Sequence, residues 1–173
     1  MSTECPLLLL DTNVWIAYFL FGRPGHDETR DLLILAIETG AEIAYPATAS
    51  KDLFYVVSRD FKMRYRSAHG GELSDSAAGA AKVTAWACVD HMAGLATAVP
   101  CDHTDVWLAG KQRKLHGDYE DDLVIAAAMR SGADLLVTYD EELRAHATVA
   151  TATPAMAMTW LEGLAAEGGK APA

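Results

Sequence analysis

The chain has 173 residues and a mass of 18.6 kDa, a length typical of one domain with its own core. Hydrophobic residues make up 51% and charged residues 22%, which excludes a disordered chain, a collagen-like chain and a coiled coil. With 14 Lys and Arg against 24 Asp and Glu, the formal net charge is −10. An overall basic surface for binding phosphates is therefore excluded, although local basic patches are not.

The cysteines and the amino-terminal segment indicate a cytoplasmic protein. Cys5, Cys88 and Cys101 are odd in number and scattered, so we expect reduced thiols rather than a disulfide framework. The apolar run Leu7–Leu10 follows no basic segment and ends at Asp11. Neither a signal peptide nor a membrane span is predicted from this pattern.

The first third of the chain alternates between strand and helix patterns. Leu7–Leu10 is wholly apolar, as in a central parallel strand, and it ends in the polar turn Asp11-Thr12-Asn13. Apolar positions over 32–37 predict a helix that stops at Gly40. Glu42–Tyr45 is predicted to be a second strand, which Pro46 ends.

The middle of the chain is predicted to be rich in helix. Thr48 or Ser50 is expected to cap a helix that continues through Val57. Residues 59–75 turn polar and basic, with a break at Gly70-Gly71. Ser74 or Ser76 then opens a long Ala-rich helix that runs to about Gly94.

The remaining pattern predicts an α/β domain with a mostly parallel central sheet flanked by helices. The expected elements are a strand over 96–100, a helix over 102–115, a helix over 120–130 capped by Asp118, a strand over 134–138, a strand near Val149 and a helix over 155–164. We expect a single domain over residues 1–164 and a flexible tail over 165–173.

Acidic side chains stand where these predicted strands end. Asp11 and Asp140 follow two strands, and Asp52 lies near the start of the helix after the second strand. Asp121 lies in the first turn of a helix, beside Asp118, Glu120 and Asp122. Ligands of parallel sheets bind outside the carboxyl ends of the strands, so we expect four carboxylates to meet at one edge of the sheet. They are Asp11, Asp52, Asp121 and Asp140.

Such a cluster favours a divalent cation. Two like unit charges about 4 Å apart repel by on the order of 4 kcal/mol at an effective dielectric constant of 20. Oxygen ligation by carboxylates suits Mg²⁺ or Mn²⁺, which can polarise a phosphodiester and lower the pKa of a bound water. Each Asp taken alone is more often only a helix cap or a complement to the helix dipole, so the metal site depends on their convergence.

Several motifs resemble those of a known family. Asp11-Thr12-Asn13-Val14-Trp15 after a hydrophobic strand resembles the opening motif of PIN domains, the fold of VapC-type toxin ribonucleases. Asp118–Leu123, followed by Ala126–Ala128, resembles the third acidic motif of that family, and Leu136–Asp140 resembles its Thr-x-Asp ending. With Ser50–Tyr55 included, the resemblance runs in order from about Leu7 to Leu161 and implies a three-layer α/β/α fold.

The resemblance implies a metal-dependent endoribonuclease, often dimeric and often held inactive by a cognate antitoxin. By position it implies Asp11, Asp52, Asp121 and Asp140 as catalytic metal ligands, with Asn13 and Thr138 in support. The second acidic position is more often Glu in the family, so the shorter Asp52 departs from the pattern. Four acids in five positions of the third motif leave open whether Asp121, Asp122 or Asp118 is the main ligand.

Positive charge is concentrated in two segments that hold seven of the 14 basic residues. One contains Arg59, Lys62, Arg64 and Arg66, and the other contains Lys111, Arg113 and Lys114. Either segment is suited to bind an RNA backbone, with Tyr55 or Tyr65 as a stacking surface for an unpaired base. The alternative interpretation is solvated helix faces and a loop.

The leading hypothesis is therefore a ribonuclease that acts as the toxin of a type II toxin–antitoxin system. A catalytically weak PIN-like module that binds RNA or protein is the alternative, because Asp52 is short and the net charge is −10. A phosphoryl-transfer domain of receiver or haloacid-dehalogenase type is disfavoured, because no Lys lies between Lys114 and Lys170. A homodimer is expected, through the apolar helix faces around Trp15–Leu20 and Leu53–Val57.

Overall fold

The protein is described by a computed structural model that covers residues 5–113 and 117–168. Within them, five parallel strands form one sheet in the order β3-β2-β1-β4-β5. The strands are β1 (Leu7–Leu10), β2 (Glu42–Pro46), β3 (Thr97–Val99), β4 (Leu135–Val137) and β5 (Thr151–Ala152). In the register of the sheet, Leu9 of the central β1 lies beside Ala44 and Leu136.

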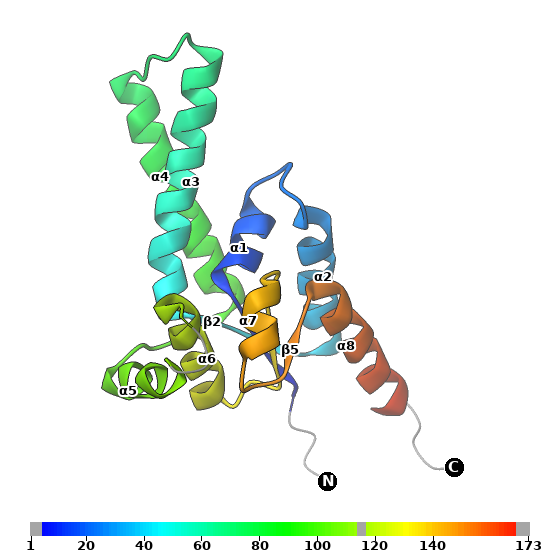
Figure 1. Cartoon of the computed structure of the whole chain (residues 1–173). Helices are drawn as coiled ribbons and strands as arrows, with labels where there is room; N and C mark the ends of the chain where they lie inside the picture. The colour runs from blue at the N-terminus through cyan, green and yellow to red at the C-terminus, as the bar shows by residue number, and fades with distance from the viewer. Residues whose placement is uncertain (1–4, 114–116, 169–173) are drawn as a thin grey trace.

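Helices connect the strands and cover both faces of the sheet (Figure 1). They are α1 (Thr12–Phe19), α2 (His26–Thr39), α3 (Ala47–Ala68), α4 (Asp75–Leu95), α5 (His103–Gln112), α6 (Tyr119–Ser131), α7 (Glu141–His146) and α8 (Pro154–Gly168). The α/β fold predicted from the sequence is confirmed. None of these helices, within the part of the chain described, is long and apolar enough to cross a membrane.

The two faces of the sheet have separate cores because successive strand residues point to opposite sides. Leu8 and Leu10 of β1 are buried with α1, α2, α3, α4 and α8. Leu9 and Leu136 are buried with α6 and α7 on the other face. The central strands β1 and β4 are thus apolar on both sides, as expected of a covered parallel sheet.

The first core also includes part of the surface that was expected to form a homodimer. Trp15, Leu53 and Val57 are buried within the chain itself, at 0%, 0% and 3% exposure. These three residues of α1 and α3 therefore serve to cover the sheet, whereas Tyr55 in the same stretch of α3 is 65% exposed.

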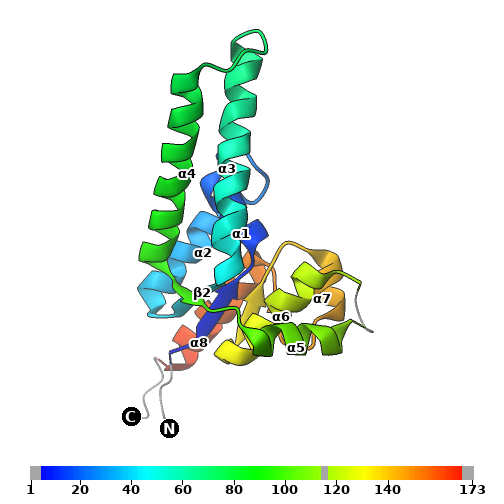
Figure 2. The same cartoon turned by 90° about the vertical axis from the view of Figure 1, so that its left-hand side faces the viewer.

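The helices α3 and α4 form a hairpin that projects beyond the rest of the molecule (Figures 1 and 2). Helix α3 begins directly after Pro46, so the prediction that Thr48 or Ser50 caps it is wrong. It also continues through the polar segment to Ala68, and at about 1.5 Å per residue its 22 residues span about 33 Å. The polar composition reflects exposure to solvent, while α3 packs on α4, whose small buried residues include Ala81 and Ala85.

The carboxyl-terminal helix is longer than the sequence predicts. Helix α8 ends at Gly168, so residues 165–168 of the expected flexible tail are helical. Ala and Glu in this stretch are strong helix formers, which explains the extension. The rest of that tail, residues 169–173, lies outside the described residues.

Candidate active site

Asp11 stands at the junction of β1 and α1. Its backbone N–H donates to the carbonyl of Val137 over 3.0 Å, which ties the ends of β1 and β4 together. Its side chain caps α1, with Oδ1 accepting from the N–H of Thr12 over 2.6 Å. The residue is only 7% exposed, so this carboxylate lies largely out of water.

Two neutral side chains hold the other oxygen of Asp11. Asn13 Nδ2 donates to Oδ2 over 2.6 Å, and the hydroxyl of Thr138 donates to the same atom over 2.8 Å. Asn13 Oδ1 accepts from the N–H of Tyr139, and Thr138 Oγ1 accepts from the N–H of Asp140. The ends of β1 and β4 thus form one hydrogen-bonded unit around the Asp11 carboxylate.

The protonation of Asp11 reflects this environment. Burial raises its pKa from 3.8 to about 6, while the hydrogen bonds from Thr138 and Thr12 oppose the rise. The negative charges of Asp140 and Glu120 raise it further. Carboxylates of α6 and of the β4–α7 junction therefore act electrostatically on Asp11, and a bound cation would relieve this repulsion.

The first turn of α6 separates the candidates of the third acidic motif by exposure. Asp118 caps the helix, with Oδ1 accepting from the N–H of Glu120 over 2.8 Å, and it is exposed. Asp122 is 2% exposed and Asp121 is partly exposed. Glu120, which the sequence analysis did not select, acts on both Asp11 and Lys51. The sequence signal that could have identified Glu120 is its position in the first turn of α6.

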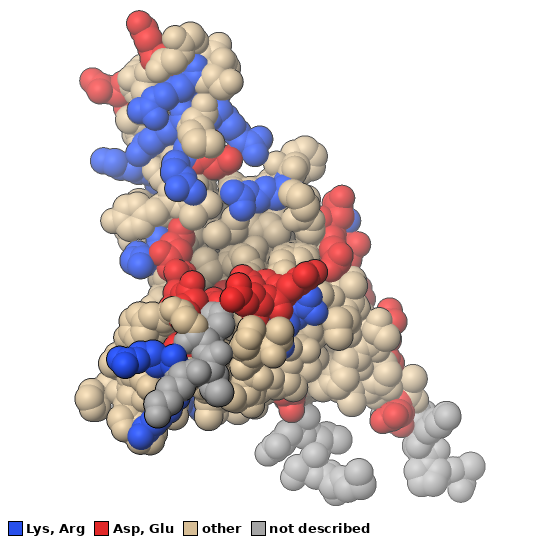
Figure 3. Space-filling model, viewed as in Figure 1, with Lys and Arg blue, Asp and Glu red and all other residues tan. Residues whose placement is uncertain are grey.

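Asp140 and Asp52 border the same edge from two other helices. Asp140 caps α7, with Oδ1 accepting from the N–H groups of Glu142 and Leu143. Asp52 Oδ1 lies 3.1 Å from the ammonium of Lys51, and its side chain is 27% exposed. Figure 3 shows acidic side chains as a band across the face at the base of the hairpin.

The expected convergence of carboxylates is present in part. The charges of Glu120 and Asp140 both act on Asp11, and those of Glu120 and Asp52 both act on Lys51. Within residues 5–113 and 117–168, no three His, Cys, Asp or Glu side chains lie close enough to hold one ion. The donors are carboxylate oxygens around a buried carboxylate, and this chemistry fits Mg²⁺ or Mn²⁺.

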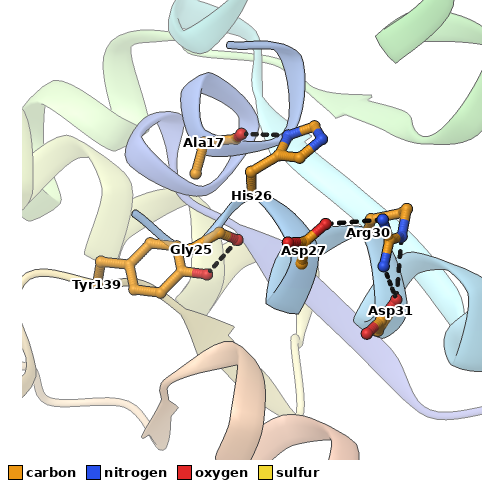
Figure 4. A network of polar contacts seen from close by, with 7 residues as sticks. All are labelled: Ala17, Gly25, His26, Asp27, Arg30, Asp31 and Tyr139. Carbon is orange, nitrogen blue, oxygen red and sulfur yellow. Dashed lines mark hydrogen bonds and ion pairs between the residues drawn. The ribbon is translucent and has the colours of Figure 1, made fainter. Parts of the chain in front are cut away.

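A tyrosine next to the site fastens the end of β4 to α2 (Figure 4). The hydroxyl of Tyr139 donates to the carbonyl of Gly25 over 2.9 Å, and the hydroxyl oxygen of Tyr139 also lies 2.9 Å from Thr29 Oγ1. A Cβ at Gly25 would come within 2.5 Å of the Tyr139 ring, and this glycine has φ of +84°. This contact holds the residue between Thr138 and Asp140, and it was missed because nothing in the sequence pairs Gly25 with Tyr139.

The two basic segments have different surroundings. Arg59, Lys62, Arg64 and Arg66 all lie on α3, and Arg64 pairs with Asp60 over 2.6 Å. Lys111 of α5 lies over the ring of Trp107, 4.9 Å from its centroid. Arg113 follows α5, and Lys114 lies outside the described residues.

Comparison with known proteins agrees with this architecture. The sequence model of the PIN domain matches residues 8–142. The structure of VapBC2 from Rickettsia felis, bound to a DNA fragment from their promoter, is similar with a TM-score of 0.61 and 16% identity, over 85% of this chain and 98% of the other. The structure of FitAcB from Neisseria gonorrhoeae has a TM-score of 0.57 and 20% identity, over 85% and 97%. No curated protein matches the sequence. Because the domain model covers most of the chain and both its strand-end motifs, the chain belongs to the PIN domain family.

Proposed function

We propose that this protein is a metal-dependent endoribonuclease that hydrolyses RNA phosphodiester bonds. The observation that carries the proposal is the buried Asp11 carboxylate, whose pKa is raised to about 6 beside Asp140 and Glu120. In a structural ion pair a basic side chain would face this carboxylate, whereas within the described residues the hydrogen-bond donors to Asp11 are the neutral groups of Thr12, Asn13 and Thr138. Membership of the PIN domain family supports the same reading.

The residues suited to hold the metal are the carboxylates of the acidic edge. We propose Asp11, Asp52, Asp121 and Asp140 as its ligands, with Glu120, Asp122 and Asp118 as the neighbouring acids of α6. When bound, Mg²⁺ or Mn²⁺ polarises the phosphodiester and lowers the pKa of an attacking water. Asn13 and Thr138 orient the Asp11 carboxylate by donating hydrogen bonds to its Oδ2.

A paired cleavage assay tests this proposal. Purified protein is incubated with total cellular RNA in Mn²⁺ or in EDTA, and wild type is compared with Asp11→Asn. We expect cleavage in Mn²⁺ that EDTA and the variant both abolish. Glu162→Gln, which removes an exposed carboxylate on α8, serves as a matched control and should retain activity. Equal cleavage by Asp11→Asn would overturn the proposal.

The α6 ligand is assigned by a second set of variants. Asp121→Asn, Asp122→Asn and Glu120→Gln each remove one charge from the same helical turn. The main ligand is the residue whose loss lowers Mn²⁺ affinity most, measured by isothermal titration. Circular dichroism of Asp122→Asn provides a folding control, because Asp122 is buried.

We further propose that the ribonuclease is the toxin of a type II toxin–antitoxin system in the cytoplasm, with a cognate antitoxin as its partner. The likeness to the VapBC2 and FitAcB structures supports this proposal. An antitoxin segment that places an Arg at the acidic edge would supply the positive charge there. Expression of wild type alone should arrest growth, and expression of Asp11→Asn should not. Unimpaired growth with active soluble wild type would favour an RNA-processing role instead.

One observation favours the second candidate, a catalytically weak module that binds RNA or protein. The ammonium of Lys51 lies 3.1 Å from Asp52 Oδ1, so the charge of this carboxylate is already partly neutralised by a side chain of the protein. Absence of Mn²⁺ binding and of cleavage, together with RNA binding, would support this module over the enzyme. The homodimer implied by the resemblance is a separate proposal, and light scattering after gel filtration measures it.

A further inference from the structure

The outer face of α3 carries a continuous row of residues suited to nucleic acid. Lys51, Tyr55, Arg59, Lys62 and Arg66 follow one another at intervals of four, four, three and four positions. At 3.6 residues per turn these five side chains fall within about 80° around the helix, along about 22 Å of its length. We name this row the α3 stripe.

The cations of the α3 stripe differ from the other Arg of the same segment. Arg64 pairs with Asp60 over 2.6 Å and reaches toward the carbonyl of Phe21. It stands about 200° around the helix from Lys62. In the part of the chain that the structure describes, no ion pair is recorded for Arg59, Lys62 or Arg66. Three of the four predicted RNA-binding cations thus share one face, and Arg64 does not.

Exposed aromatic rings lie beside these cations. Tyr55 is 65% exposed and Trp86 of α4 is 59% exposed, with Phe54 between them at ring distances of 5.5 and 5.2 Å. A shallow hollow of about 260 Å³ is lined by Lys51, Tyr55 and Trp86, and a second of about 320 Å³ by Tyr55, Arg59, Lys62 and Arg66. Tyr55 belongs to both hollows, so the aromatic and the basic surfaces are continuous.

The α3 stripe begins at the acidic edge. Lys51 is the first member of the stripe, and its ammonium lies 3.1 Å from Asp52 Oδ1. The pKa of Lys51 is raised, mainly by Asp52 and to a smaller extent by the negative charge of Glu120. Figure 3 shows Lys and Arg side chains over the hairpin on the same face as the acidic band below. A polyanion bound along the hairpin would therefore lead from the cations to the carboxylates.

We propose that the α3 stripe, with Trp86, is the binding track for single-stranded RNA and delivers an unpaired segment to the acidic edge. This inference rests on the proposed ribonuclease function. Unpaired cations bind the phosphates, and the exposed rings of Tyr55 and Trp86 stack on splayed bases. Base stacking separates single strands from duplexes, whose bases are already stacked. An acidic protein segment would use the cations but has no bases to place on the rings.

Binding measured in EDTA, where no cleavage is expected, tests the track. A fluorescently labelled single-stranded oligonucleotide and its duplex are titrated with wild type, and anisotropy is recorded over a series of salt concentrations. The variant Arg59→Gln/Lys62→Gln/Arg66→Gln should weaken binding by about tenfold or more and reduce the salt slope by about two. The matched control Arg64→Gln, which also loses one α3 cation, should stay within about twofold of wild type.

The aromatic part has its own signature. Tyr55→Ala/Trp86→Ala should weaken single-strand binding by about tenfold or more, with an unchanged salt slope and little change for the duplex. Circular dichroism verifies that each variant is folded, which is expected because all five substituted side chains lie at the surface or partly so. Wild-type affinity in both multiple variants would overturn the track and leave this face to a protein partner.

The same measurements separate failure of the track from failure of the proposed function. Cleavage by wild type with unaltered RNA binding by the variants would reject the α3 stripe and keep the nuclease. Loss of binding in the variants without any cleavage in Mn²⁺ would support the track and reject the nuclease.

Discussion

At the edge of the sheet, Asp11 is 7% exposed and accepts hydrogen bonds from three different residues, whereas on the hairpin Tyr55 and Trp86 each leave more than half of their surface exposed. In the first region a carboxylate is buried, and burial raises the free energy of its charged form. The second holds positive charge in water, where it costs little. We infer that the edge of the sheet holds its groups in fixed positions, whereas the hairpin offers an exposed surface for binding.

This difference predicts how each region should affect a reaction. Preorganised groups around a reacting centre change the rate of the chemical step, because they act on the transition state. Exposed cations and rings along a track bind the substrate before and during reaction alike, so they change its affinity. Variants of the two regions should therefore differ in which kinetic constant they alter.

Asp11→Asn should give the largest effect. We expect kcat for RNA cleavage to fall by about a hundredfold or more, because the amide supplies no negative charge to hold a cation. RNA affinity measured in EDTA should stay close to that of wild type. A fall in affinity with preserved kcat would instead place Asp11 in the binding surface and break the comparison.

The pH dependence of stability gives the next largest effect. The pKa of Asp11 is raised from 3.8 to about 6 in the folded state, so between these values the folded protein binds more protons than the unfolded chain. Stability should therefore fall as pH rises through this window, by up to about 3 kcal/mol from this group, with the loss complete above the folded value.

Urea unfolding in EDTA at pH 4.5, 5.5 and 7 measures this dependence. In Asp11→Asn the free energy of unfolding should no longer show the fall with pH that Asp11 causes, whereas Glu162→Gln should show the same fall as wild type. Mn²⁺ should restore stability more at pH 7 than at pH 5, because protons compete with the metal for Asp11. An identical slope in wild type and Asp11→Asn would show that the buried carboxylate does not titrate in this range.

The edge of the sheet was also the part of the site that sequence could predict. Asp11 and Asp140 follow strands whose apolar runs are plain, and parallel strands bring their carboxyl ends to one edge. The sequence could not decide among the acids at positions 118, 120, 121 and 122, because side chains at neighbouring positions of a helix point in different directions. Only the packed helix shows that Glu120 acts on Asp11 while Asp122 is buried.

The hairpin was harder to predict for a physical reason. Residues 59–68 of α3 include no buried side chain, so they lack the apolar stripe that usually marks a helix, and the predicted helix was not continued beyond Val57. The sequence shows the basic residues of α3 as one group. That Arg64 differs from the other three depends on its ion pair with Asp60, which only the structure shows. The contact of Tyr139 with Gly25 joins positions more than a hundred residues apart, and no local pattern contains it.

Gly25→Ala tests whether the edge depends on its support from α2. Its Cβ would come within 2.5 Å of the Tyr139 ring, whereas Gly22 has the same φ of +84° and open space around it. Gly22→Ala should cost about 1 kcal/mol of stability from the left-handed backbone alone. Gly25→Ala should cost about 1–3 kcal/mol more because Tyr139 must move. We also expect a lower kcat in Gly25→Ala only, since Thr138 and Asp140 flank Tyr139. Equal losses in urea unfolding would show that the contact is easily displaced.

The smallest effect is expected from the hairpin, and salt reveals it best. The variant Arg59→Gln/Lys62→Gln/Arg66→Gln should raise KM by about tenfold at low salt and leave kcat unchanged, because the exposed cations bind ground and transition states equally. As salt increases, the difference in KM between this variant and wild type should shrink, since counterions then screen the same phosphates. Initial rates at three salt concentrations supply the measurement, with Arg64→Gln as the control. A drop in kcat at saturating RNA would mean that the hairpin takes part in positioning the scissile phosphate, and the two regions would then act as one site.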